Sequence, residues 1–129
     1  MTRRILHVED DPSQRSLLRI TLAQLGGFEV DSAPDGFRAL ELAGARRPDL
    51  VVLDVHLPGI SGMDTLRALR EIAGMRDVPV IFLTASGDLM THVELLWLGV
   101  LKVVQKPVRP FRLASLIQAA FSGAGEEAA

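Results

Sequence analysis

The sequence predicts an α/β domain, a (βα)5 sandwich in which helices cover both faces of a five-stranded parallel sheet. Two observations predict this fold. Five short apolar runs rich in β-branched residues recur along the chain, and the segments between them carry apolar residues at helical spacing. Strands that alternate with helices of about 10–15 residues form βαβ units, which build parallel sheets buried on both faces.

The strands and helices follow one another in regular order. The predicted strands are Ile5–Val8, Phe28–Ala33, Leu50–Val55, Val80–Thr84 and Val100–Val104. The predicted helices are marked by Leu18, Leu22 and Leu25; by Phe37, Leu40 and Ala43; by Leu66, Leu69 and Ile72; by Leu89, Val93 and Leu96; and by Leu113, Leu116, Ile117 and Ala120. For the first helix, Asp11 and Pro12 suit an N-cap and a first turn, and Gly26-Gly27 suits its end.

Composition limits the class of protein. The chain has 129 residues, with 14 Lys+Arg against 16 Asp+Glu, a net charge of −2, and 48% hydrophobic residues. This size and apolar content predict one folded domain and argue against disorder. The lack of cysteine excludes disulfides, thiol catalysis and Cys-ligated metal sites. With no Lys/Arg cluster, no signal peptide and no membrane span, we expect a cytoplasmic protein without direct nucleic-acid or membrane contacts.

Polar side chains gather where the predicted strands end, although the strands themselves are apolar. The first strand is followed by Glu9, Asp10 and Asp11, the third ends near Asp54, the fourth ends in Thr84, and the fifth is followed by Lys106. Ligands of open α/β sheets bind outside the carboxyl ends of the strands. Carboxylates that meet there repel unless a cation neutralises them, and hard oxygen ligands favour Mg²⁺. A metal and a lysine beside an aspartate suit transfer of a phosphoryl group to that aspartate.

Four motifs lie at these strand ends, namely ILHVEDD, DLVVLDVHLPGISGMD, PVIFLTA and QKP, in this order. Together they resemble the motifs of response-regulator receiver domains of two-component systems. The resemblance implies a flavodoxin-like fold with strand order 2-1-3-4-5. It also implies a receiver domain over residues 3–122, of the stand-alone, single-domain type, followed by a flexible tail over residues 123–129.

The resemblance assigns a magnesium site to the first and third strands. Asp54 matches the phosphoacceptor, and Glu9 and Asp10 match the acidic pair of the family. Asp10 would bind Mg²⁺ directly and Glu9 mainly through water. The backbone carbonyl of His56, two residues after Asp54, would be a further ligand.

The resemblance assigns phosphoryl contacts to the fourth and fifth strands. Thr84 would donate a hydrogen bond to a phosphoryl oxygen, and Lys106 would form an ion pair with the phosphoryl group. In the family the peptide bond before Pro107 is usually cis. Two positions depart from the family pattern, because Val103 stands where the family usually has Tyr or Phe, and Ser61 where Asp is common. An aromatic side chain that swings inward on activation cannot operate where the chain has a valine. These departures leave the phosphorylation chemistry intact but change the conformational response to phosphorylation.

Structural roles compete with each functional assignment. Asp10 and Asp11 could simply cap the first helix. His7, inside an apolar strand, is expected to be a hydrogen-bonded core histidine and not a ligand. A second function class on the same fold is an FMN-binding protein or an aspartyl-phosphate phosphatase. However, the loop EDDPSQ would repel a bound phosphate, and a haloacid-dehalogenase-like phosphatase needs an aspartate where this chain has His56.

The resemblance implies a signalling module that turns over no metabolite. A histidine kinase or a histidine phosphotransfer protein would donate the phosphoryl group, and an unknown downstream protein would respond. The fourth helix, fifth strand and fifth helix are expected to form a contact face for a partner or a second copy. This face would include Leu95, Trp97, Leu98, Val100, Leu101 and Val103.

Overall fold

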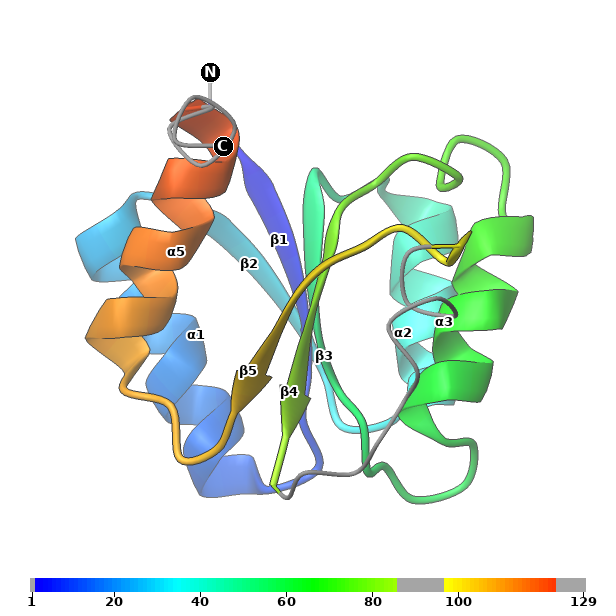
Figure 1. The fold of residues 1–129 in the computed structure, drawn as a ribbon, viewed down its shortest axis with the longest axis horizontal. Helices are drawn as coiled ribbons and strands as arrows, with labels where there is room; N and C mark the ends of the chain where they lie inside the picture. Colours follow the sequence, from blue (N-terminus) through cyan, green and yellow to red (C-terminus); the bar gives the residue numbers. More distant parts are fainter. Residues whose placement is uncertain (1, 86–96, 123–129) are drawn as a thin grey trace.

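The computed structural model describes residues 2–85 and 97–122 and contains the predicted parallel sheet. Its strands are β1 (Arg4–Val8), β2 (Glu29–Ala33), β3 (Leu50–Asp54), β4 (Val80–Thr84) and β5 (Val100–Gln105), in the order β2-β1-β3-β4-β5. All four strand pairings are parallel, so all the carboxyl ends lie along one edge of the sheet, the lower edge in Figure 1. The predicted fold class and strand order are confirmed.

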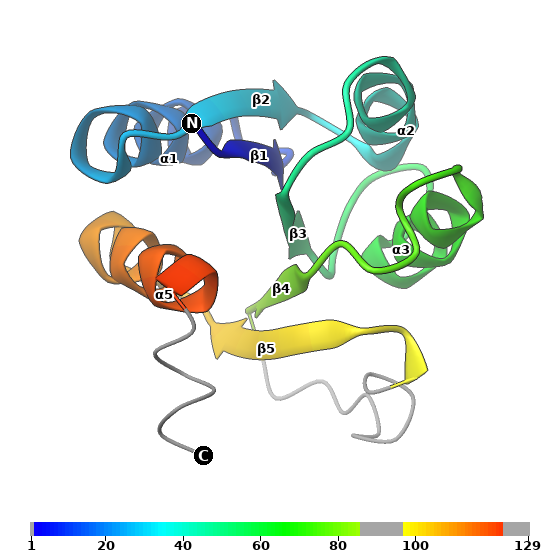
Figure 2. The same cartoon turned by 90° about the horizontal axis from the view of Figure 1, so that it is seen from above.

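Helices cover both faces of this sheet. They are α1 (Pro12–Gly26), α2 (Gly36–Ala45), α3 (Gly62–Glu71) and α5 (Pro110–Ser122). Figure 2 shows α1 and α5 on one face and α2 and α3 on the other. None of the helices in the described ranges is long and apolar enough to cross a membrane. The fourth predicted helix, marked by Leu89, Val93 and Leu96, and the predicted tail over residues 123–129 lie outside the described residues.

Alternate residues of the strands supply two separate cores. Leu6, Val51 and Phe82 pack beneath α2 and α3, whereas the neighbouring residues Ile5 and Ile81 pack beneath α1 and α5. This division follows from the period of two in a strand, where successive side chains point to opposite faces. The central strands β3 and β4 are buried at every residue and therefore read as continuous apolar runs.

The edge strand β5 differs from the other strands. Its residues are exposed or half-buried, and an irregularity in its pairing with β4 leaves Leu101 without a register partner. An edge strand with one extra residue bends and exposes side chains that a central strand would bury. Two of the apolar residues that mark the predicted helices, Leu25 and Phe37, are likewise exposed.

Capping residues fix both ends of α1. The Asp11 carboxylate accepts hydrogen bonds from the backbone N–H groups of Ser13 and Gln14, with Pro12 in the first turn of α1. At the other end of α1, Gly27 is left-handed at φ 70°, a conformation that glycine adopts without steric cost. Both the start and the end of this helix are therefore as the sequence predicts.

Arg70 joins three segments at the amino end of β4 and β5. Its guanidinium donates hydrogen bonds to the carbonyl oxygens of Met75 (2.7 Å), Val78 (2.7 Å), Leu98 (2.9 Å) and Gly99 (3.3 Å). A planar guanidinium with five donors can bind several carbonyl oxygens at once. Arg70 thereby anchors the turn that leads into β5.

Glycine substitutions provide a test of the packing at the carboxyl edge. At Gly62, an added Cβ would overlap the carbonyl oxygen of Asp54 and lie 2.7 Å from the Cα of Val55. Gly62→Ala should therefore lower the free energy of unfolding by about 1–3 kcal/mol. At the control position Gly44, in the last turn of α2, nothing lies within 4 Å. Gly44→Ala should raise stability by about 0.5 kcal/mol. Urea unfolding of both variants measures the two changes, and equal effects would contradict the close contact at Gly62.

Candidate functional site

Each of four strands delivers one polar group to the carboxyl edge of the sheet. Asp54 and Thr84 are the last residues of β3 and β4, Glu9 follows β1, and Lys106 follows β5. Backbone hydrogen bonds extend the sheet past these ends, from Glu9 N–H to Ala33 O (3.0 Å) and from Lys106 N–H to Thr84 O (2.6 Å). The structure thus brings together the predicted residues of strands that are distant in the sequence.

Lys106 lies between two buried carboxylates. Its Nζ is 2.7 Å from Oε1 of Glu9 and 2.5 Å from Oδ2 of Asp54. Burial by itself would lower the pKa of Lys106, but the hydrogen bonds and charges of Asp54 and Glu9 outweigh burial and raise it. Lys106 is therefore a permanent cation at the site. The peptide bond that follows it, before Pro107, is cis, as expected.

The two buried carboxylates are also held by backbone groups. The second oxygen of Glu9, Oε2, accepts a hydrogen bond from Asp11 N–H (3.2 Å), so both oxygens of this side chain have partners. In Asp54, Oδ1 accepts from His56 N–H (3.1 Å). Only 1% of Glu9 and 4% of Asp54 is exposed. Burial and these hydrogen bonds together hold each carboxylate in one orientation. His56 itself is exposed beside this buried group.

Asp10 is the exposed member of the acidic group. One carboxylate oxygen each from Glu9, Asp10 and Asp54 lie within 4.8 Å of one another. Hydrogen bonds and ion pairs within the described ranges engage Glu9 and Asp54 but not the Asp10 carboxylate. Three hard oxygen donors, one of them solvent-exposed, suit Mg²⁺, which binds one or two carboxylates and keeps several waters. The residues present therefore fit the predicted metal.

Arg15, which the sequence analysis did not single out, also contacts the acidic loop. Its Nη1 donates hydrogen bonds to the carbonyl oxygens of Glu9 (2.9 Å) and Asp10 (3.3 Å). The only signal in the sequence is an arginine one turn inside a helix that starts at three acidic residues. That signal does not show whether the side chain turns back toward the loop or outward to solvent.

His7 is buried in the core as predicted, but the prediction of a hydrogen-bonded histidine is wrong. Both ring nitrogens of His7 are buried and have no hydrogen-bond partner among the described residues, and the same holds for the hydroxyl of Ser32, its register partner on β2. Burial, with the nearby charges of Lys106 and Arg15, lowers the pKa of His7 to about 4. The imidazole is therefore neutral in the folded protein at pH 7.

Comparison with known proteins identifies the family of this chain. The sequence profile of the response regulator receiver domain matches residues 5–118. The chain belongs to the response regulator receiver domain family. The receiver domain is 41% identical over 119 residues to the DNA-binding response regulator MtrA of Mycolicibacterium smegmatis. That match covers 92% of this chain and 50% of the relative, so the chain spans about half the length of this response regulator.

Solved receiver domains have the same fold. A CheY-like receiver domain protein from Methanospirillum hungatei matches with a TM-score of 0.85 at 24% identity, over 98% of this chain and 99% of its own. The receiver domain of the sensor histidine kinase PA1611 from Pseudomonas aeruginosa matches with a TM-score of 0.77 at 30% identity, over 92% and 96% of the two chains. The PA1611 structure holds a magnesium ion in its active-site cleft.

The unpartnered histidine makes receiver stability depend on pH. Because the pKa of His7 is about 4 in the folded state and about 6.5 in the unfolded state, the unfolded chain binds its proton first as pH falls. The contribution of His7 to stability is complete above pH 6.5 and is lost as pH falls toward 4. From pH 7 to pH 5 this loss is about 2 kcal/mol. Urea unfolding at both pH values should show a smaller difference in His7→Phe than in the wild type, and equal differences would contradict the assignment.

Proposed function

We propose that this receiver domain is the phosphoacceptor of a two-component system or phosphorelay, with Asp54 as the acceptor. The observation that carries the proposal is the position of Lys106, which pairs at once with Asp54 and Glu9 at the carboxyl edge of the sheet. A cation that already pairs with the acceptor carboxylate can also pair with the oxygens of a phosphoryl group attached to it, and so stabilise their negative charge. We infer that the domain acts only on itself and turns over no metabolite.

In the proposed reaction a carboxylate oxygen of Asp54 attacks the phosphorus of a phosphohistidine. A bond forms between the aspartate oxygen and phosphorus, the bond between phosphorus and the imidazole nitrogen breaks, and that nitrogen keeps the electron pair. Lys106, which pairs with the Asp54 carboxylate, would then pair with the phosphoryl oxygens. Thr84, buried at the end of β4, would donate a hydrogen bond from its hydroxyl to one of them. The described side chains thereby offset charge that increases at the phosphoryl group.

Mg²⁺ would be held at the acidic edge by the residues that the sequence predicts. Asp10 and Asp54 would bind it directly, Glu9 mainly through water, and the backbone carbonyl of His56 would be a further ligand. When bound, Mg²⁺ neutralises negative charge on the carboxylates and the phosphoryl oxygens.

A groove beside Lys106 would receive the phosphodonor, a histidine kinase or a histidine phosphotransfer protein. The groove has a volume of about 190 Å³ and runs between α1 and the start of α5, lined mainly by apolar side chains. Its lining includes Leu17, Leu83 and Pro110 as well as Lys106, which pairs with Asp54. A partner seated there would bring its histidine to the acceptor.

The output face, the predicted contact face for a downstream protein or a second copy, would lie on the side of β5 away from this groove. Trp97 is 86% exposed, and Leu101 and Val103 are exposed beside it in the sequence. Leu98, which the sequence analysis included in this face, packs against the core instead, and Leu95 lies outside the described residues. We propose that this face binds a downstream protein or a second copy. We do not expect the receiver portion itself to bind DNA, because its net charge is −2 and its site is acidic.

Phosphorylation itself is tested by intact-mass measurement with a small phosphodonor and Mg²⁺. The wild type should gain one phosphoryl group, and Asp54→Asn should gain none because the nucleophile is lost. Asp10→Ala should lose most of the reaction together with its dependence on Mg²⁺. Labelling that persists in Asp54→Asn would contradict the assignment of the acceptor.

The output face is tested by light scattering with and without phosphorylation. If Trp97 anchors a second copy, Trp97→Glu should weaken association of the phosphorylated protein by about tenfold or more, because a buried aromatic anchor is replaced by a charge. Phe37→Glu, which changes another exposed aromatic residue on α2, is the matched control and should associate like the wild type. A wild type that stays monomeric in both states, with an unchanged affinity of Trp97→Glu for a downstream partner, would show that the face is ordinary surface.

A further inference from the structure

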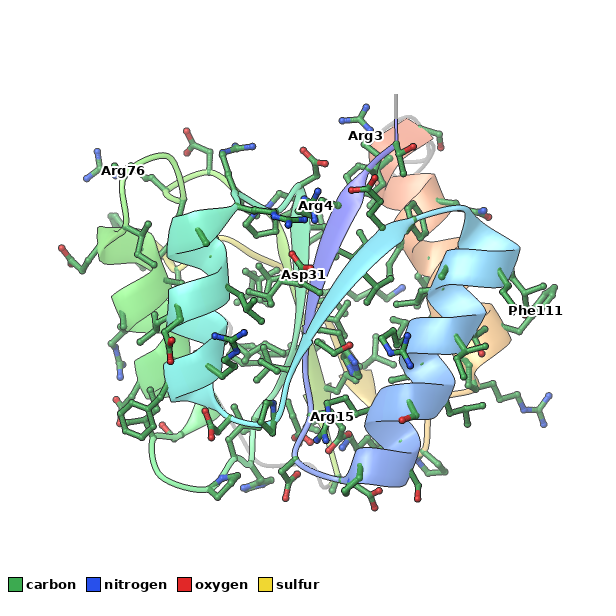
Figure 3. All side chains as sticks on the ribbon, turned by 180° about the vertical axis from the view of Figure 1, so that it is seen from behind. Arg3, Arg4, Arg15, Asp31, Arg76 and Phe111 are labelled. Atoms are coloured by element: carbon green, nitrogen blue, oxygen red, sulfur yellow. The ribbon has the colours of Figure 1, made fainter. Side chains whose placement is uncertain are left out.

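Arg15 reaches back from α1 to the loop that carries the acidic pair. The side chain starts one turn inside the helix, is half-buried, and lies at the carboxyl end of β1, opposite to the end where Arg4 lies (Figure 3). One nitrogen, Nη1, donates to two consecutive carbonyl oxygens, those of Glu9 at 2.9 Å and Asp10 at 3.3 Å. These carbonyls belong to the residues whose side chains form the acidic pair.

The two cations of the site bind different kinds of oxygen. Lys106 binds carboxylate oxygens, those of Glu9 and Asp54, and so occupies atoms that could hold a metal or a phosphoryl group. Arg15 binds carbonyl oxygens, and leaves the Asp10 carboxylate without a bond inside the described part of the chain. The hydrogen bonds of Arg15 therefore restrain the backbone of the loop without using a carboxylate oxygen.

The charge of Arg15 and its hydrogen bonds have opposite effects on a cation at the acidic pair. A guanidinium remains positive at all pH values of interest, and a positive charge beside the carboxylates repels Mg²⁺. The two hydrogen bonds fix the direction of the Glu9-Asp10 backbone, which lowers the entropy that the loop loses when it binds an ion. The sign of the change in Mg²⁺ affinity on removing Arg15 thus distinguishes the two effects.

We propose that Arg15 is a positioning residue for the cation site, which holds the Glu9-Asp10 backbone so that the Asp10 carboxylate faces Asp54. This inference rests on the proposed Mg²⁺-dependent function. Positioning outweighs repulsion, because the guanidinium contacts the loop directly through two hydrogen bonds, whereas its charge is partly screened by water at a half-buried position.

The experiment is a calorimetric titration of the unphosphorylated protein with Mg²⁺ alone. Arg15→Met removes the charge and both hydrogen bonds, and it should weaken Mg²⁺ binding by about tenfold. Arg15→Lys keeps the charge, but its ammonium ends one bond short of the Nη1 position that makes both hydrogen bonds, and it should weaken binding by about threefold. Arg19→Met removes the same charge at an exposed position one turn further along α1 and should bind Mg²⁺ like the wild type.

Two results would overturn the positioning role. Tighter Mg²⁺ binding by Arg15→Met would show that charge repulsion dominates, and equal binding by wild type and Arg15→Lys would show that the hydrogen bonds made by Nη1 are not needed. Amide hydrogen exchange of residues 9–12 in the metal-free protein is a second readout, and should be faster in both Arg15 variants. If Arg15→Met does not fold, Arg15→Lys decides both measurements.

The same proteins separate this proposal from the proposed function. A wild type that binds Mg²⁺ but takes up no phosphoryl group contradicts the phosphoacceptor function, and the positioning role is still decided by the Mg²⁺ affinities. A wild type that is phosphorylated, with Arg15 variants equal to it in Mg²⁺ affinity, overturns only the positioning role. A wild type that binds no Mg²⁺ overturns both.

Discussion

The convergence of three carboxylates at one edge of the sheet is the constraint on which the rest of the site depends. Parallel strands place all their carboxyl ends together, so Glu9, Asp10 and Asp54 come within 4.8 Å although the third lies more than forty residues away in sequence. Without cations their mutual repulsion would oppose folding. Lys106, half-buried between Glu9 and Asp54, offsets this repulsion in the protein itself, and Mg²⁺ binding would offset it further.

The surrounding fold keeps these charged groups in place. The buried strands β3 and β4 fix the backbone of Asp54 and Thr84. Because Gly62 has no side chain, α3 can start close to the carbonyl of Asp54 at the end of β3. On the other side, Asp11 caps α1 and donates its backbone N–H to Glu9, so one residue links the helix to the acidic pair. The geometry of the site is therefore a consequence of backbone packing as much as of side-chain pairing.

Most of the candidate site could be predicted because its chemistry is concentrated at strand ends. The alternation of apolar strands and helices predicts a parallel sheet, and the strand ends then predict where Asp54, Thr84 and Lys106 lie. Arg15 and His7 show where this inference stops. Arg15 contacts carbonyl oxygens, which every residue has. Whether His7 finds a hydrogen-bond partner depends on the neighbours that the folded sheet brings beside it, and Ser32, its neighbour on β2, makes no such bond within the described residues.

The sequence by itself determined the fold class, the order of elements, the helix start at Asp11 and the residues at the carboxyl edge, because periodicity, capping and strand ends are local properties of the chain. Tertiary structure alone decided which carboxylate oxygens pair with Lys106, that Arg70 joins α3 to the turn before β5, and that Leu25 and Phe37 are exposed. These features depend on contacts between residues far apart in the chain, and on where an element lies in the sheet. Neither property is encoded in the spacing of neighbouring residues.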